Sequence, residues 1–204
     1  RGSNMESILK SIKTKKIPIN PAVVISNKID AKGLAIAKKM GVNVEVIESK
    51  NFKGTRSEFD EKIMEILVKY GVTPRNGLVC LAGFMRIISP EFVKKYKNKI
   101  INIHPALLPA FPGLNSQKQA LDYGAKYSGC TVHFVDAGMD TGAIIIQSIV
   151  EIKNKDTEKS LSKKILKEEH RIYPQAVSLF ARKKNQSIRK KNAYLLRIRA
   201  TKKI

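Results

Sequence analysis

The stretch Ile100-Ile-Asn-Ile-His-Pro-Ala-Leu-Leu-Pro-Ala-Phe-Pro-Gly113 predicts the end of a buried strand near the middle of the chain. Its first residues are mostly apolar, and the three prolines and one glycine that follow cannot continue a regular ladder. Because side chains alternate along a strand, Asn102 and His104 point to the same side. The stretch therefore predicts an amide and an imidazole side by side at the mouth of a sheet.

The rest of the chain alternates short apolar runs with longer amphipathic segments, a pattern that favours βαβ units and a mostly parallel sheet. A first helix is predicted from Met5, because apolar residues recur from there at helical spacing. Further strands are predicted at 21–26, 42–47, 77–82, 130–135 and 144–152, and further helices at 30–40, 56–70, 116–123 and 155–182. The segment 187–198 is expected to form a polar hairpin on a sheet edge.

Length and composition favour one globular domain over residues 1–204, with a basic hairpin or tail from about 183. Hydrophobic residues make up 43% and charged residues 27% of the 204 residues, as in ordinary globular proteins. There is neither an apolar run of about 20 residues nor a charged leader, so a soluble cytoplasmic protein without membrane partners is expected. Cys80 and Cys130 lie in apolar runs and are expected to be buried, reduced thiols.

The formal net charge of +22 would suit binding to nucleic acid or a membrane surface, or attraction of anionic ligands. The lysines are scattered along amphipathic segments such as 61–69 and 159–167, where a solvated helix face is the simpler explanation. The densest basic run begins at Arg182 and contains no acidic residue. A basic RNA-binding module remains an alternative, although aromatic residues, which such modules interleave with Lys and Arg, make up only 6%.

The imidazole of His104 is the strongest candidate for proton transfer, because it follows a strand end and imidazole titrates near neutral pH. His133 and His170 lie within predicted elements and are expected to be structural. The carboxylate expected to reach His104 is Asp140, in a loop with two glycines, and Asp136 is its competitor.

An amide, an imidazole and a carboxylate suit acyl transfer better than metal binding, so no metal is expected. Asn102 and a protonated His104 can stabilise an oxyanion when a nucleophile adds to a carbonyl. The sequence shows no Ser or Cys nucleophile next to a base, which favours direct attack by a substrate amine.

Two other segments are candidates for ligand contact. Gly2-Ser3-Asn4 precedes the first helix, where Ser3 and Asn4 could cap it or the backbone could bind phosphate; a cloning remnant is the alternative. Met85 to Ile88, after Gly83, could wall a flat apolar ligand with Arg86 nearby, or could simply be core around a turn.

Five ordered motifs resemble the folate-dependent formyltransferases, and the likeness extends from Gly2 to about Arg182. The motifs are Val24-Ile-Ser-Asn-Lys28, Leu81-Ala-Gly-Phe-Met-Arg-Ile-Ile88, Asn102-Ile-His-Pro-Ala-Leu-Leu-Pro109 with Phe111-Pro-Gly113, Gly129-Cys-Thr-Val-His-Phe-Val135, and Asp140-Thr-Gly142. The resemblance implies a Rossmann-like α/β fold with helices on both faces of a mostly parallel sheet. It also implies a strand before the glycine loop, which is expected to be missing from this chain, and a serine where Ala106 stands.

The resemblance is greatest to the branch that formylates glycinamide ribonucleotide in purine biosynthesis. It implies 10-formyltetrahydrofolate as co-substrate, two small-molecule substrates, no nucleic-acid partner, and a monomer or homodimer. The alternatives within the family are formyltetrahydrofolate hydrolase and methionyl-tRNA formyltransferase, each of which resembles this chain less and carries an additional domain.

By position, the resemblance assigns catalysis to Asn102, His104 and Asp140, with Asp140 holding His104 protonated as acid and oxyanion partner of the tetrahedral intermediate. It assigns the ribonucleotide phosphate to Gly2, Ser3 and Asn4, and its ribose or glycinamide end to Glu169. The residues that it assigns to the formyl-folate are Arg56, Met85, Arg86, Ile87, Ile88, Asn102, Asp136 and Asp140.

Overall fold

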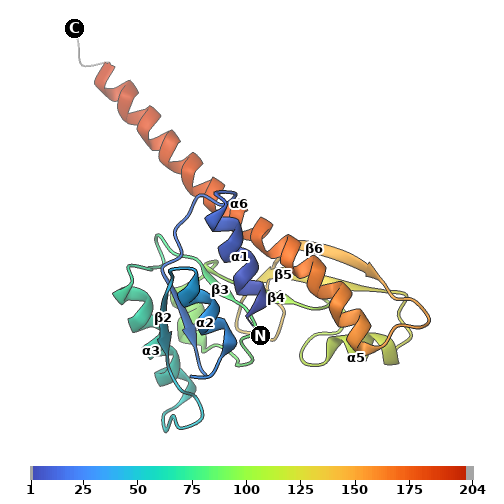
Figure 1. Cartoon of the computed structure of the whole chain (residues 1–204). Coiled ribbons are helices and arrows are strands. Elements are labelled where there is room, and N and C mark those ends of the chain that lie inside the picture. The colour runs from blue at the N-terminus through green and yellow to red at the C-terminus, as the bar shows by residue number, and fades with distance from the viewer. Residues whose placement is uncertain (1, 201–204) are drawn as a thin grey trace.

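The computed structural model describes residues 2–200, and their side chains through residue 182. In chain order the elements are α1 (Ser3–Lys13), β1 (Val23–Ser26), α2 (Lys32–Lys39), β2 (Asn43–Val46), α3 (Arg56–Lys69), β3 (Val79–Leu81), α4 (Pro90–Lys95), β4 (Ile100–His104), α5 (Ser116–Asp122), β5 (Tyr127–Phe134), β6 (Ile144–Glu151) and α6 (Glu158–Ala200). Figure 1 shows that strands and helices alternate through most of the chain. The predicted α/β fold class is confirmed.

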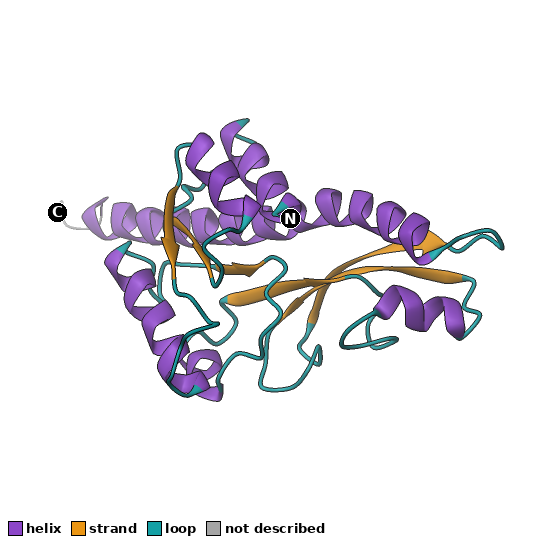
Figure 2. Ribbon diagram, turned by 60° about the horizontal axis from the view of Figure 1, so that its bottom comes forward, coloured by secondary structure: helices purple, strands orange, loops and turns teal. Residues whose placement is uncertain are grey.

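The strands form two separate sheets. Strands β1 and β2 pair in parallel, and the second sheet has the order β3-β4-β5-β6. In this second sheet β3 and β4 are parallel, whereas β5 runs antiparallel to both β4 and β6. The parallel pairs β1–β2 and β3–β4 agree with the expected arrangement, and the loop from β5 to β6 is too short to hold a crossover helix, so that pair is antiparallel. Figure 2 shows this long antiparallel pair beneath α6.

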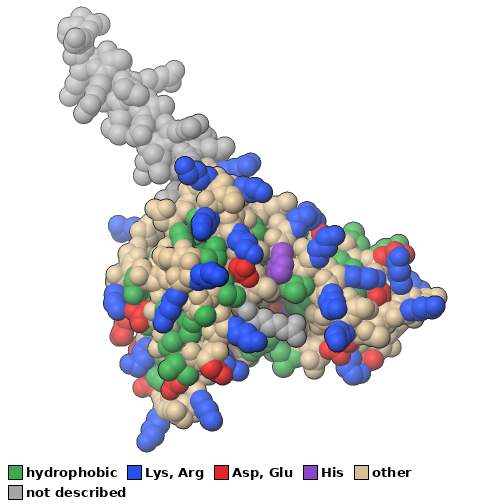
Figure 3. Space-filling view, in the orientation of Figure 1, with side chains coloured by type: hydrophobic (Ala, Val, Ile, Leu, Met, Phe, Trp, Pro, Cys, Tyr) green, Lys and Arg blue, Asp and Glu red, His purple; other side chains and the backbone are tan. Residues whose placement is uncertain are grey.

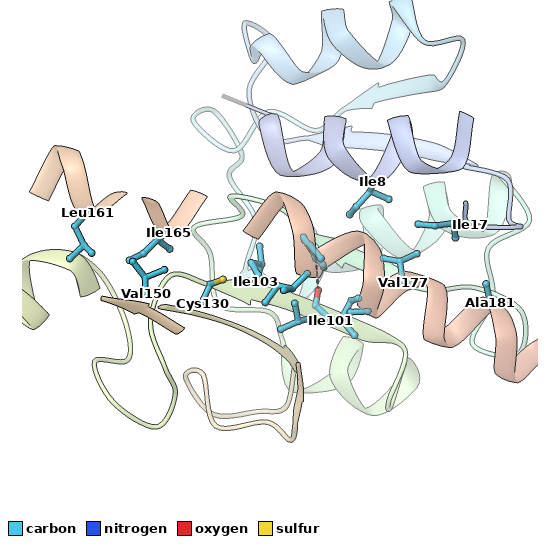
Figure 4. Close-up of a cluster of buried hydrophobic side chains, with 14 residues drawn as sticks. Ile8, Ile17, Ile101, Ile103, Cys130, Val150, Leu161, Ile165, Val177 and Ala181 are labelled. Carbon is cyan, nitrogen blue, oxygen red and sulfur yellow. Dashed lines mark hydrogen bonds between the residues drawn. The ribbon is translucent and has the colours of Figure 1, made fainter. Parts of the chain in front are cut away.

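Helices cover both faces of the strands, as expected. On one face, α1 and α6 pack on β4 and β5 through side chains that include Ile8, Ile101, Cys130 and Val177 (Figure 4). On the other face, α3 and α4 bury Ile100 together with a set of large side chains, among them Phe59, Ile63, Phe92 and Tyr96. Strand β4 is therefore central, and its alternation places Asn102 and His104 on the side opposite Ile101.

The hairpin expected at 187–198 is wrong, since α6 continues without interruption to Ala200. A two-residue hairpin needs residues that tolerate positive φ, and this segment has no glycine at its centre. Its arginine, lysine, leucine and alanine residues are all good helix formers. The C-terminal part of α6 extends beyond the other elements (Figure 1).

Candidate active site

The last residues of β4 position two of the three candidate catalytic side chains. Asn102 lies opposite His133 and His104 lies opposite Thr131 in the antiparallel register with β5. His104 is buried, with 4% of its surface exposed. The two strands thus present two cross-strand pairs of polar side chains in an interior where apolar residues would be expected.

Asp140 supplies the carboxylate at this site. Its Oδ2 lies 3.3 Å from Nδ1 of His104, and its Oδ1 lies 3.5 Å from Nε2 of His133. The backbone N–H of Gly113 donates to the same Oδ2 over 2.9 Å. Asp136, the competing candidate, instead accepts hydrogen bonds inside its own loop, from the backbone of Gly138 and the hydroxyl of Thr141.

The ring of His104 lies between two acceptors. Its Nε2 is 2.9 Å from the carbonyl oxygen of Phe111, and because a carbonyl can only accept, this nitrogen carries a proton. Its Nδ1 faces the carboxylate of Asp140. The ring of His104 is thus fixed from both sides, by the carbonyl of Phe111 at Nε2 and by the carboxylate of Asp140 at Nδ1.

His133 also belongs to the site, although the sequence predicted a structural role for it. Its Nδ1 donates to the carbonyl of Phe134 over 2.8 Å, and burial lowers its pKa, so the ring is neutral and Nε2 is an acceptor. The amide Nδ2 of Asn102 lies 3.3 Å from this nitrogen. His133 therefore orients the amide of Asn102, and only the β4–β5 register could have revealed this.

A buried hydroxyl and a buried amide hold the loop that follows His104. The hydroxyl of Thr131 donates to the carbonyl of Ala106 over 2.7 Å and accepts from the backbone N–H of Leu108. The amide of Gln147 donates to both Thr131 Oγ1 and the carbonyl of Leu108. His104, Thr131 and Gln147 occupy successive strands in register, so this loop is tied to the sheet.

The candidate phosphate site lies at the start of α1. Gly2 is the N-cap residue with φ of 80°, so the expectation that Ser3 and Asn4 cap the helix is wrong. Both are already helical, and the side chain of Asn4 donates from Nδ2 to Glu169 Oε2 over 2.7 Å. Burial raises the pKa of Glu169, while the hydrogen bond from Asn4 opposes this shift. The structure thus brings together two of the residues assigned to the ribonucleotide.

Helix α6 connects this end of the molecule to the sheet. One turn after Glu169, the hydroxyl of Tyr173 lies 2.6 Å from the carbonyl of Leu81 and 3.2 Å from that of Ile101. Ile101 precedes Asn102 directly in β4. Glu169 is therefore held over the same end of β3 and β4 that carries the imidazole and amide side chains.

The residues assigned to the formyl-folate are divided between surface and core. Met85 and Ile87 are 79% and 51% exposed, whereas Ile88 is buried in the core. The guanidinium of Arg86 lies 4.4 Å from the centre of the Phe59 ring. Arg56 is exposed at the first turn of α3, a helix that begins with a capping box formed by its N-cap residue.

Lysine and arginine side chains are spread over the face seen in Figure 3 rather than gathered in one patch. This distribution fits the scattered pattern in the sequence. In the part of the chain that the structure describes, no helix is long and apolar enough to cross a membrane. Nor do the described residues include a group of three or more His, Cys, Asp or Glu side chains suited to hold a metal ion.

The formyl transferase family matches residues 1–177 of the chain. The trifunctional purine biosynthetic protein adenosine-3 of Gallus gallus is 43% identical over 180 residues, which are 88% of this chain and 17% of that protein. The chain thus spans about a sixth of the length of such trifunctional relatives. Phosphoribosylglycinamide formyltransferase of Escherichia coli is 38% identical over 180 residues, which cover 88% of this chain and 82% of that enzyme.

Solved structures agree with these relationships. The crystal structure of glycinamide ribonucleotide transformylase 1 from Symbiobacterium toebii has a TM-score of 0.84 and 47% identity, covering 89% of this chain and 83% of that one. Phosphoribosylglycinamide formyltransferase from Anaplasma phagocytophilum has a TM-score of 0.80 and 42% identity, over 90% and 83%. In its sequence and its fold, this chain belongs to the formyl transferase family.

Proposed function

We propose that the protein transfers the formyl group of 10-formyltetrahydrofolate to the amine of glycinamide ribonucleotide, a step of purine biosynthesis. The names of the relatives support glycinamide ribonucleotide as the acceptor, and membership of the formyl transferase family supports a formyl-folate as the donor. The observation that carries the proposal is the contact between His104 Nδ1 and Asp140 Oδ2, beside the amide of Asn102. These three groups supply N–H donors for the oxyanion that forms in acyl transfer to an amine, and a carboxylate that orients the imidazole.

The amide and the imidazole stabilise negative charge on the formyl oxygen. An amide has two N–H donors, and His133 accepts one of them from Asn102, so the other is available for an oxyanion. The second donor is the N–H group at Nε2 of His104, which donates to the carbonyl of Phe111 in this structure. Asp140, 3.3 Å from Nδ1, holds the ring in the orientation that this contact requires.

The proton balance then follows directly. The substrate amine forms a bond to the formyl carbon and loses one proton, while the bond from that carbon to the folate nitrogen breaks. The folate nitrogen gains one proton as it leaves. His104 can donate a proton to the folate nitrogen and accept one from the substrate amine. Because the amine attacks the formyl carbon directly, no covalent enzyme intermediate is needed.

The two substrates would approach from different sides of β4. The free N–H groups in the first turn of α1 suit the ribonucleotide phosphate, and Asn4 and Glu169 suit its polar glycinamide or ribose end. The exposed side chains of Met85 and Ile87 suit the flat pterin ring, with the loop 136–140 beside the catalytic carboxylate. Arg56 would attract the anionic part of the folate.

The test is formyl transfer measured with three acceptors: glycinamide ribonucleotide, methionyl-tRNA and water. We expect the protein to transfer the formyl group to the ribonucleotide. We expect His104→Ala to lack this activity, while its circular dichroism spectrum shows that the variant is folded. Hydrolysis or tRNA formylation without transfer to the ribonucleotide would overturn the proposal. Asp122→Asn serves as a control, because Asp122 is an exposed carboxylate at the end of α5 that pairs with Lys118 and is assigned to neither substrate.

A further inference from the structure

One face of α3 meets the segment 83–89, which connects β3 to α4. Arg56, Phe59 and Asp60 are spaced at i, i+3 and i+4 along α3, so they lie on one face of this helix. Arg56 is assigned to the formyl-folate, as are the residues 85–88. Phe59 and Asp60 follow Arg56 by one turn, and both contact the segment 83–89.

The carboxylate of Asp60 holds the end of the segment. Asp60 is buried, with 1% of its surface exposed. Its Oδ2 accepts a hydrogen bond of 2.6 Å from the backbone N–H of Ser89, which is the N-cap residue of α4. Ser89 directly follows Ile88. The carboxylate thus fixes the backbone immediately after the residues that are assigned to the formyl-folate.

An aspartate is an unfavourable residue for this position. Asp is a poor helix former, and a carboxylate removed from water costs free energy unless hydrogen bonds compensate for it. Its neighbours in the buried face of α3 are apolar and include Ile63 and Met64. Because an apolar side chain of similar volume would often pack there at no cost, the carboxylate indicates a need for its hydrogen bond to Ser89.

The ring of Phe59 holds the middle of the segment. The guanidinium of Arg86 lies 4.4 Å from the centre of this ring, within the range of a cation–π contact. Phe59 is itself fixed by Phe52, whose ring meets it edge to face at 5.2 Å between centres. Arg86 is therefore held against α3, while its neighbours Met85 and Ile87 stay exposed.

The segment is also fixed where it leaves β3 and where it enters the core. The carbonyl of Leu81, the last residue of β3, accepts a hydrogen bond from Tyr173. Ile88 is buried with Phe92 in the core between α3 and α4. These contacts leave the exposed side chains of the segment to face a ligand.

We propose that Asp60 is a positioning residue for the formyl-folate site, an inference that rests on the proposed function. Asp60 acts through Ser89 and does not touch the ligand. Its hydrogen bond restricts the segment 85–88 to one arrangement, in which Met85 and Ile87 form one wall for the pterin ring. Without this bond the ligand has to order the segment when it binds, which lowers its affinity.

Two substitutions with the same branching separate the hydrogen bond from packing. Asp60→Asn keeps an oxygen that can accept from Ser89, whereas Asp60→Leu removes both acceptors. Glu61→Leu is the matched control, because Glu61 is exposed on the same helix. For each protein kcat and the KM values for both substrates are measured, and urea unfolding establishes that it is folded.

The expected result is a rise in one KM only. Asp60→Leu should raise KM for 10-formyltetrahydrofolate roughly tenfold or more, and change KM for glycinamide ribonucleotide by less than about twofold. Asp60→Asn should restore most of the affinity for the folate, and Glu61→Leu should match the wild type. Equal rises in both KM values, a rise in neither, or equal damage from Asn and Leu would overturn the proposal.

A second pair of variants removes the same hydrogen bond from the side of its donor. Ser89→Pro eliminates the N–H, and the φ of −66° at this position suits proline. Ser89→Ala is its comparison, because both variants lose the side-chain acceptor for the N–H of Phe92 and only proline loses the donor to Asp60. Folate affinity should be lower for Ser89→Pro than for Ser89→Ala, and equal affinities would contradict the role of Asp60.

Two readouts do not depend on turnover. Amide hydrogen exchange in the peptide 83–92, without ligand, should be faster in Asp60→Leu than in Asp60→Asn. Binding of tetrahydrofolate, measured by calorimetry, should weaken in the same order, while binding of inorganic phosphate stays unchanged. Exchange and tetrahydrofolate binding that are the same in both variants would overturn the proposal.

These measurements distinguish failure of the inference from failure of the proposed function. A protein whose tetrahydrofolate binding depends on Asp60, but which does not formylate glycinamide ribonucleotide, would contradict the proposed function alone. Normal tetrahydrofolate binding and normal transfer to the ribonucleotide in Asp60→Leu would contradict the role of Asp60 alone.

Discussion

The side-chain amide of Asn4, in the first turn of α1, donates a hydrogen bond of 2.7 Å to Glu169 on α6, which lies 165 residues further along the chain. Helices at the two ends of the described fold thus meet at a buried carboxylate. The oxygen Oδ1 of Asn4 is buried and has no hydrogen-bond partner among the described residues. A polar ligand group at this position would satisfy it, which fits the assignment of Asn4 and Glu169 to the ribonucleotide.

The pH dependence of stability should reveal the environment of Glu169. Burial raises its pKa above the usual 4.5, so folding is linked to uptake of a proton. Its favourable contribution is present below the unfolded pKa and is lost as the pH rises through the folded pKa. We expect the free energy of unfolding of Glu169→Gln, relative to wild type, to increase as the pH rises above 4.5, measured by urea unfolding at several pH values.

The neighbouring Glu168 provides a control of opposite sign. Hydrogen bonds from Ser148 and Arg171 lower its pKa, so its stabilising contribution is present above the unfolded pKa and is lost as the pH falls. Glu168→Gln should therefore lose most stability relative to wild type at neutral pH. The same slope in both variants would contradict the assignment for Glu169.

Removal of the imidazole or the carboxylate should abolish most of the turnover. We expect His104→Ala and Asp140→Asn each to lower kcat by roughly 10²–10⁴, the range measured for general acid–base and oxyanion groups. The readout is steady-state formyl transfer. Asp122→Asn should remain close to wild type, because Asp122 is exposed, pairs with Lys118 and is assigned to neither substrate. Near-normal kcat in folded His104→Ala would exclude its role.

His133→Leu should lower kcat with little change in KM for either substrate. The neutral ring orients the amide of Asn102, so its loss leaves the amide in place but free to rotate. A double-mutant cycle with Asn102→Ala distinguishes this from a general loss of packing. We expect strong non-additivity, since both variants remove the same oriented donor. Additive effects on kcat would show that His133 acts independently of Asn102.

Thr131→Val should destabilise the protein by about 1–3 kcal/mol. Valine has nearly the same shape as threonine but cannot accept the hydrogen bond from the N–H of Leu108, which then loses this partner in a buried position. Urea unfolding measures the change. Thr14→Val is a matched control, since the hydroxyl of Thr14 is exposed and bonds only to carbonyls of its own helix end. Equal effects of the two substitutions would contradict a tie between the sheet and the loop after His104.

The sequence predicted the site where local periodicity determines geometry. Alternation along β4 placed Asn102 and His104 on one face, and the glycines around Asp140 indicated a loop that could reach them. Asp140 has φ of 57°, a conformation that its loop imposes and that only the structure reveals. The pairing of His133 with Asn102 depends on the register between β4 and β5, which alternation within one strand does not specify.

The wrong prediction of a hairpin at the C-terminal end has a local origin. A segment rich in lysine and arginine can form a helix or a hairpin, and the preceding helix favours continuation, since adding a residue to an existing helix avoids nucleation. The sequence also did not reveal the antiparallel pairing of β5, because short apolar runs look alike whichever direction they take. Helix α4 was missed, although Ser89 and Pro90 form a standard helix start.

The contact between Gly2 and Gly33 imposes unequal restrictions on the two positions. A Cβ on Gly33 would meet its nearest atom at 3.5 Å, an ordinary van der Waals distance, so natural or designed variants could carry alanine there. A Cβ on Gly2 would collide with backbone at 2.7 Å while the residue holds a positive φ. Sequence diversity can therefore accumulate on α2, whereas the turn that leads into α1 tolerates no side chain at all.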